Sequence, residues 1–194
     1  IRKEKFGHLR AAAKETKIKG AVCEFGVHAG HSLKVLCEAF PKDIVWGFDS
    51  FEGLPEDWNT GTRLREDGII RKEEFILDIS EIVFPKNSKI IKGWFDQSIL
   101  KWKREYKVKT IKFLHIDSDL YSSAKTILKE LNNEIKKDTI IVFDELATFA
   151  RQEKYPNWKE GEWKALIEWI NEYDREFEIL MRSGYWNATI RITK

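Results

Sequence analysis

The stretch that decides the fold is AVCEFGVHAGHS, which covers residues 21–32. Its first half is a short apolar run ending at Gly26, a pattern typical of a buried β-strand followed by a turn. Its second half leads through Gly30 to Ser32, where a helical pattern begins that stops before Pro41. Glycines between a strand and a helix allow a tight turn and let a ligand approach the backbone closely. The stretch therefore predicts a strand–loop–helix unit with a binding site at the loop.

The alternation of strand-like and helix-like segments continues to the end of the chain. Short apolar runs predict strands over residues 44–48, 88–92, 110–116 and 139–143. Apolar residues at helical spacing predict helices over residues 2–17, 72–81, 96–105, 121–136 and 160–174. The last strand-like runs, residues 177–182 and 185–193, flank Ser183 and Gly184 as in a β-hairpin. We therefore expect an α/β fold in one domain of residues 1–194, with a mostly parallel seven-stranded sheet and a C-terminal antiparallel hairpin.

The composition narrows the classes of function. Of the 194 residues, 42% are hydrophobic, which is enough for a core and excludes a mainly disordered chain. The net charge is only +2 and the sequence has no basic run, so we expect no nucleic-acid partner. No apolar run approaches the roughly 20 residues of a membrane span. The polar N-terminus does not resemble a signal peptide.

Two further features concern the cellular compartment of the protein and the polypeptide to which the chain belongs. Cys23 and Cys37 lack the spacing of metal ligands, which indicates reduced thiols in a cytoplasmic protein. The chain does not begin with Met, so it could be one domain of a longer polypeptide.

Acidic residues accompany the glycine loop. Glu24 lies in the first strand, and Asp49 ends the second strand. An acid at the latter position accepts hydrogen bonds from ribose hydroxyls in nucleotide-binding folds, although a turn cap is the simpler alternative. The glycine spacing is not that of a dinucleotide or phosphate loop, and Glu24 would repel a pyrophosphate but suit a cationic ligand. Glu24, Gly26, Gly30 and Asp49 together predict the nucleoside site of an enzyme that uses S-adenosylmethionine (SAM).

More acids follow the fourth and fifth predicted strands. Asp117 and Asp119 close the fourth strand, and Asp144 and Glu145 close the fifth. In an extended segment Asp117 and Asp119 would point to the same face. Carboxylates crowded at one sheet edge raise one another's pKa values, and a divalent cation with oxygen ligands, such as Mg2+, relieves the repulsion. Capping of the next helix by Asp119 and simple solvation of Glu145 are the alternatives.

Five stretches resemble the macrocin-type O-methyltransferases. They are VCEFGVHAGHS, VWGFDSFEGLPEDW, IKGWFDQS, FLHIDSDLYSS and IIVFDEL, in this order between about residues 20 and 145. The resemblance implies a Rossmann-like class I methyltransferase that depends on SAM and on Mg2+. Its acceptor would be a hydroxyl of a sugar, in a glycan or a glycoside.

The resemblance also implies roles for individual residues. The contacts to SAM would come from the glycine loop and the neighbouring strand ends: Glu24, Phe25, Gly26, Gly30, Ser32, Asp49, Ser50 and Asp117. The residues near the adenine would be Gly93, Trp94 and Phe95. The metal would be held by Asp117, Asp144 and Glu145, and Asp119 would lie close to the reacting hydroxyl. At that distance we expect Asp119 to accept the proton of the hydroxyl. The family usually has Asp-Asp where this chain has Asp144 and Glu145, and the longer glutamate moves its oxygen outward.

Other assignments stay open. His28, His31 and His115 are alternative bases. Packing or hydrogen bonding within the loop is the simpler role for His28 and His31, and burial against a helix is the simpler role for His115. Tryptophans that could stack on a sugar or on adenine, or belong to the core, are Trp58, Trp94, Trp158 and Trp163. Residues 55–71 form either a lid or a solvated loop.

Two other functions compete with sugar methylation. One is methylation of a catechol-like small molecule, and the other is a SAM-binding module without catalysis. A homo-oligomer or companion glycan-processing domains would fit any of them.

Overall fold

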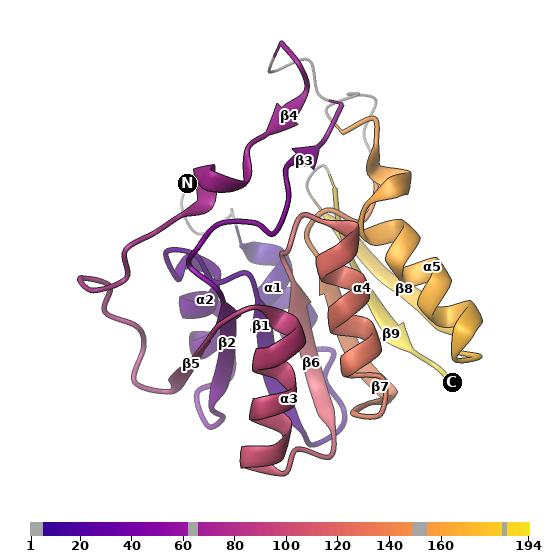
Figure 1. The fold of residues 1–194 in the computed structure, drawn as a ribbon. Helices are drawn as coiled ribbons and strands as arrows, with labels where there is room; N and C mark the ends of the chain where they lie inside the picture. Colours follow the sequence, from indigo (N-terminus) through magenta and orange to yellow (C-terminus); the bar gives the residue numbers. More distant parts are fainter. Residues whose placement is uncertain (1–5, 62–65, 149–154, 184–185) are drawn as a thin grey trace.

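The computed structural model describes residues 6–61, 66–148, 155–183 and 186–194 (Figure 1). A seven-stranded sheet forms its centre, with the strand order β5-β2-β1-β6-β7-β9-β8. The first five strands in this order are parallel, whereas β9 runs antiparallel to both β7 and β8. The strand bounds are β1 Ala21–Phe25, β2 Val45–Asp49, β5 Ser88–Lys92, β6 Ile111–Ile116, β7 Ile135–Phe143, β8 Phe177–Ser183 and β9 Asn187–Ile192. The predicted parallel sheet with its terminal hairpin is confirmed.

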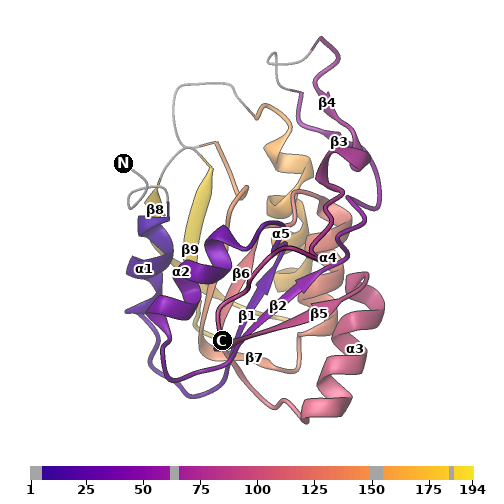
Figure 2. The same cartoon turned by 90° about the vertical axis from the view of Figure 1, so that its left-hand side faces the viewer.

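Helices cover both faces of the sheet (Figure 2). One face carries α1 (Gly7–Ala13) and α2 (His31–Ala39). The other carries α3 (Phe95–Tyr106), α4 (Tyr121–Glu130) and α5 (Glu162–Glu172). Successive strand side chains alternate between the two layers, because a strand turns its side chains to opposite faces. In β6, Phe113 packs in the α1–α2 layer, whereas Leu114 and Ile116 pack in the other.

Several predicted element boundaries were wrong. The helix predicted over residues 121–136 ends at Glu130, because Ile135 begins β7 instead of completing the helical face. Of the helix predicted over residues 2–17, the structure contains α1 (Gly7–Ala13), which ends four residues before the predicted end. Residues 1–5 lie outside the described residues. The segment predicted as a helix over residues 72–81 forms only the 3-10 turn η1 (Lys72–Phe75), which has no buried residue to hold it against the core.

The long polar stretch after β2 contains structure that its composition did not predict. Strands β3 (Trp58–Asn59) and β4 (Ile69–Ile70) pair antiparallel and form an arm beyond the edge of the main sheet (Figure 1). Residues 62–65, within the predicted lid, lie outside the described residues. None of the described helices is long and apolar enough to cross a membrane.

Candidate active site

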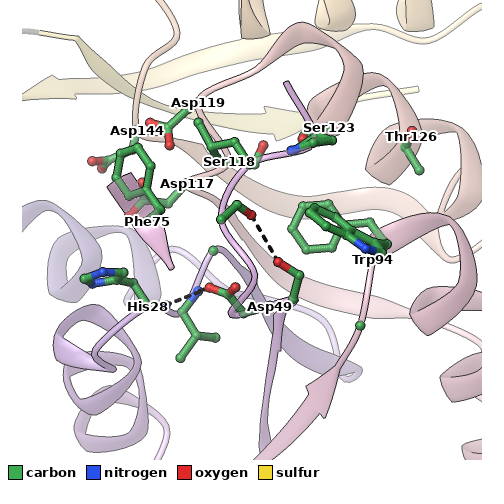
Figure 3. A pocket seen from close by; sticks show the side chains of 18 of the residues that line it. His28, Asp49, Phe75, Trp94, Asp117, Ser118, Asp119, Ser123, Thr126 and Asp144 are labelled. Carbon is green, nitrogen blue, oxygen red and sulfur yellow. Dashed lines mark hydrogen bonds between the residues drawn. The ribbon is translucent and has the colours of Figure 1, made fainter. Parts of the chain in front are cut away.

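A cavity of about 700 Å³ lies at the carboxyl ends of the parallel strands, where ligands bind in open α/β sheets. Its wall contains residues from the loops after β1, β2, β5, β6 and β7. Figure 3 shows Asp117, Asp119 and Asp144 at one end of the cavity and Trp94 with Thr126 at the other. The predicted site residues in the wall are Gly26, Ser32, Asp49, Ser50, Gly93, Trp94, Phe95, Asp117, Asp119 and Asp144.

The glycine loop, residues 26–30, passes close to the end of β6. Gly26 has a φ of +93°, which favours glycine, and a Cβ there would lie 1.7 Å from the carbonyl oxygen of Asp117. Gly30 also has a positive φ and precedes α2. The first glycine therefore allows two strand ends to meet, and the backbone of the loop forms one side of the cavity.

Asp49 connects this loop to the end of β2 through hydrogen bonds. Its Oδ2 accepts hydrogen bonds of 2.8 Å from the backbone N–H groups of Val27 and His28, and its Oδ1 accepts one from Phe51. A carboxylate has about four lone-pair positions, so one position is left for a ligand. Asp49 thus has the turn-capping role that was the alternative, and it also lines the cavity. Its contact with a ribose remains a prediction.

The structure does not bring every predicted cofactor contact to the cavity. The side chains of Glu24 and Phe25 are fully buried and, like Gly30, lie outside the cavity wall. Phe25 stacks on Phe48 in the core, with ring centroids 4.4 Å apart. Glu24 lies beside His115, whose Nδ1 is 2.9 Å from its Oε1. The side chains of Glu24 and Phe25 therefore do not reach the cavity, because consecutive strand residues point to opposite faces of the sheet and both faces are covered by helices. A contact of SAM with their backbone stays a prediction.

Aromatic side chains complete the wall. Trp94 and Phe95 follow β5, as predicted. Phe75 also lines the cavity and meets the His28 ring edge-on at 6.2 Å. Phe75 was not singled out by sequence analysis, because its segment was predicted only as a short helix over residues 72–81. His28 and His31 line the cavity, whereas His115 is 99% buried against the α1–α2 layer, as predicted.

The carboxylates of Asp117, Asp119 and Glu145 form an acid cluster. One oxygen from each lies within 4.8 Å of the other two. Asp119 has a φ of +63°, so the expectation of an extended segment with both aspartates on one face was wrong. The left-handed conformation nevertheless brings Asp119 beside Asp117. Asp117 and Asp119 line the cavity, whereas Glu145 lies behind its wall.

Burial and mutual repulsion shift the pKa values of the acid cluster. Burial and the charge of Asp144 raise the pKa of Asp117 well above its usual range. The same two causes raise the pKa of Asp119 to about 7 and that of Glu145 well above its usual value. Each shift means that the ionised form is held at a cost in free energy.

Asp144, the remaining predicted metal ligand, lies near the acid cluster and also meets two histidines. Its Oδ1 lies 3.3 Å from Nε2 of His8 and 3.7 Å from Nε2 of His115. Burial opposes ionisation of Asp144, but the two histidines outweigh it and lower the pKa of this carboxyl well below its usual range. The three carboxylates that lie within 4.8 Å of one another are thus Asp117, Asp119 and Glu145, and Asp144, whose charge acts on all three, stays a predicted metal ligand.

Glu162 is a further buried acid that sequence reasoning missed. It begins α5, its side chain is fully buried, and its Oε2 accepts a hydrogen bond from the backbone N–H of Glu145. Burial raises its pKa well above the usual value. A glutamate in the first turn of an amphipathic helix is ordinarily exposed, so the pattern gave no signal of this position.

The acid cluster fits a cation with oxygen ligands. Within the described residues, Glu145 Oε2 and Glu162 Oε1 are buried and have no hydrogen-bond partner. A buried carboxylate oxygen without a partner is costly, and a divalent cation would satisfy it. The donor set is carboxylate only, which suits Mg2+.

An aromatic cluster of Trp58, Tyr155 and Trp186 attaches the β3–β4 arm to the rest of the molecule. The Tyr155 ring packs 5.6 Å from Trp58 and 5.7 Å from Trp186. Nδ2 of Asn157 donates a hydrogen bond to Asn59 of β3. Two of the other predicted stacking residues, Trp158 and Trp163, pack on each other and lie outside the cavity wall.

The model of the macrocin O-methyltransferase (TylF) family matches residues 1–160. The chain belongs to this family. Membership confirms the resemblance carried by the five sequence stretches, and it makes the chain an O-methyltransferase by family. No curated protein sequence matches the chain significantly.

Solved structures agree with the family in fold. The calicheamicin methyltransferase CalS11 is 21% identical, with a TM-score of 0.71 over 96% of this chain and 78% of its own. The O-methyltransferase NovP is 18% identical, with a TM-score of 0.65 over 98% of this chain and 80% of its own. The mycinamycin methyltransferase MycE, solved with Mg, S-adenosylhomocysteine and mycinamycin VI, is 17% identical, with a TM-score of 0.58 over 97% of this chain and 49% of its own. At these identities the likeness establishes the class I methyltransferase fold of this family member.

Proposed function

We propose that this chain is a SAM- and Mg2+-dependent O-methyltransferase that acts on a sugar hydroxyl. The observation that carries the proposal is that one cavity is lined by the glycine loop, Asp49 and Trp94 and also by Asp117 and Asp119. The first group suits a nucleoside with a cationic sulfonium, and the second suits a metal and a proton transfer. Family membership supports the reaction type. The sugar acceptor is supported by the names of structural neighbours, since CalS11 is also described as a TDP-rhamnose 3′-O-methyltransferase.

The residues at the Trp94 end would hold the cofactor. SAM supplies a methyl group already activated for transfer, so the protein has to position it and exclude water. The backbone at Gly26 leaves room for close approach, and Asp49 keeps one lone-pair position for a hydroxyl. The Trp94 side chain offers an apolar face for the adenine.

The residues at the acid end would hold the cation and move the proton. Asp117 and Glu145 would hold Mg2+, which lowers the pKa of a bound hydroxyl. Asp144 as a further ligand remains a prediction. Asp119 lines the cavity beside Asp117, and burial together with Asp144 raises its pKa to about 7. A carboxylate with that pKa accepts a proton near neutral pH more readily than an ordinary aspartate does.

The test is a methyl-transfer assay with purified protein, SAM and a panel of acceptors. The panel contains nucleotide sugars, glycosides with free vicinal hydroxyls, and catechols, and products are identified by mass spectrometry. We expect a methyl group on a sugar oxygen, loss of turnover after exhaustive chelation, and recovery with Mg2+. Methylation of catechols but of no sugar would show that the acceptor is a catechol-like small molecule and not a sugar. SAM binding without turnover on any acceptor would favour a binding module.

The cellular compartment, the extent of the domain and the partner proteins are also proposals. Cys23 and Cys37 are both free and buried, which supports a reducing, cytoplasmic compartment. We place one methyltransferase domain over residues 1–194. A homo-oligomer or companion glycan-processing domains remain predictions.

A further inference from the structure

Buried polar residues interrupt the apolar layer between the sheet and α1. Glu24 and His115 face each other in register on the neighbouring strands β1 and β6, and Asp144 follows the end of β7 beside them. Helix α1 packs on this part of the sheet through Leu9, Ala12 and Ala13. It adds His8, whose side chain is only 7% exposed. Residues from four separate elements therefore meet in a region that is otherwise hydrophobic.

Both histidines direct the same ring nitrogen at one carboxylate oxygen. Nε2 of His8 lies 3.3 Å and Nε2 of His115 lies 3.7 Å from Oδ1 of Asp144. Within the described residues neither nitrogen has a hydrogen-bond partner. The three ligand atoms nevertheless lie within 4.8 Å of one another. Both distances are in the range of an ion pair with a protonated histidine, and either such protons or one shared metal ion would satisfy these buried atoms.

The opposite side of the His115 ring has the partner that metal-binding histidines usually have. Its Nδ1 lies 2.9 Å from Oε1 of the fully buried Glu24. A carboxylate at Nδ1 fixes the tautomer and leaves the lone pair of Nε2 for a metal, as in carboxylate–histidine–zinc arrangements.

We propose that His8, His115 and Asp144 form a binding site for a divalent transition-metal ion of the Zn2+ type, separate from the acid cluster. Ligands at about 2.0–2.1 Å from a tetrahedral Zn2+ are about 3.3 Å apart. The distances from the two histidines to Asp144 are close to this value. Two imidazoles and one carboxylate suit Zn2+ or Co2+, whereas Mg2+ prefers oxygen ligands only.

The position of the site gives it two consequences. Asp144 lines the cavity, so an ion has an entry path and a fourth ligand position can face the cavity. His8 lies on α1 and the other ligands belong to the sheet, so the ion would fasten α1 beside the candidate active site. The proposal needs neither SAM nor an acceptor, but it shares Asp144 with the proposed function, in which Asp144 is a predicted further ligand of Mg2+.

The test is a titration of the whole, chelator-treated protein with Co2+ in excess Mg2+, which keeps oxygen-only sites occupied. We expect one equivalent of Co2+ to bind with the intense visible d–d absorption of a four-coordinate site, and Zn2+ to displace it. Zn2+ at about 100 times its dissociation constant should also raise the Tm by about 5 °C or more.

Variants separate this site from general histidine binding. His8→Gln should weaken Co2+ binding at least 100-fold and abolish the Tm shift, with the fold verified by circular dichroism. The matched control is His31→Gln, since His31 is exposed and belongs to neither cluster of potential ligands among the described residues. It should bind Co2+ as the wild type does. Asp144→Asn serves if His8→Gln does not fold. No visible band in the wild type, or a band that persists in His8→Gln or depends equally on His31, would overturn the proposal.

Discussion

The two ends of the cavity differ in how well their polar groups are satisfied without a ligand. At the glycine-loop end, Asp49 accepts three backbone hydrogen bonds. At the acid end, oxygens of Glu145 and Glu162 are buried without partners, and burial raises the pKa values of both groups. The polar groups at the first end are hydrogen-bonded within the protein, whereas at the second end the proposed cation would satisfy them. Changes at the first end should therefore cost stability, and neutralising changes at the second should increase stability and remove activity.

The largest effect is expected from Gly26→Ala. The new Cβ would meet the Asp117 carbonyl at 1.7 Å, and the φ of +93° is strained for alanine. Strain and overpacking together should lower the free energy of unfolding by about 5 kcal/mol. Urea denaturation measures it. The control is Gly7→Ala, where a Cβ meets nothing within 4 Å, and an equal loss in both variants would contradict the account.

Asp119→Asn tests the acid end in catalysis. The amide keeps the size of the side chain but cannot take a proton, so turnover should fall by about 10²–10⁴ with SAM affinity unchanged. Steady-state kinetics and calorimetry measure the two quantities. The exposed Asp174→Asn, whose partner is Lys194, is the control. Near-normal turnover in Asp119→Asn would move the base to His28 or His31.

Asp49→Ala tests the glycine-loop end in binding. Loss of a charged acceptor should weaken S-adenosylhomocysteine binding by about 1.5–3 kcal/mol. The same change releases the N–H groups of Val27 and His28, so the free energy of unfolding should fall as well. An Asp49→Ala protein that binds the ligand as tightly as the wild type would contradict both roles.

Trp58→Ala gives the smallest expected effect on the reaction. Loss of its contact with Tyr155 would loosen the β3–β4 arm. We expect the acceptor KM to rise about tenfold, equivalent to about 1.4 kcal/mol, with SAM affinity unchanged. The matched control is Trp163→Ala, which removes a tryptophan outside the cavity wall and the aromatic cluster. If Trp58→Ala changed SAM affinity instead, the arm would belong to the cofactor end.

Sequence reasoning succeeded where the determinant is local. Gly26 and Asp117 directly follow β1 and β6, Asp49 is the last residue of β2, and Trp94 lies two positions after β5. Predicting the strands therefore also placed these residues at one edge of the sheet. The same reasoning failed for Glu24, which was read from its motif although strand alternation buries it.

The site residues and element boundaries that were not predicted depend on contacts between residues distant in sequence. His8 and Glu162 lie in helices and reach the strand ends only through tertiary packing. Asp119 joined the acid cluster through a positive φ that no side-chain pattern indicated. Ile135 had a helical spacing and a strand environment, and the environment prevailed.

The most direct test of the difference between the two ends is the free energy of unfolding of the wild type and of Glu145→Gln, with and without Mg2+. The pKa of Glu145 is raised in the folded state, so its ionisation opposes folding and the wild type without metal should lose stability as pH rises above the unfolded pKa of about 4.3. We predict that without metal at pH 8 Glu145→Gln is more stable than the wild type, by about 1 kcal/mol or more, and that saturating Mg2+ reverses the order. A Glu145→Gln protein less stable than the wild type without metal, or an order that Mg2+ leaves unchanged, would contradict the account.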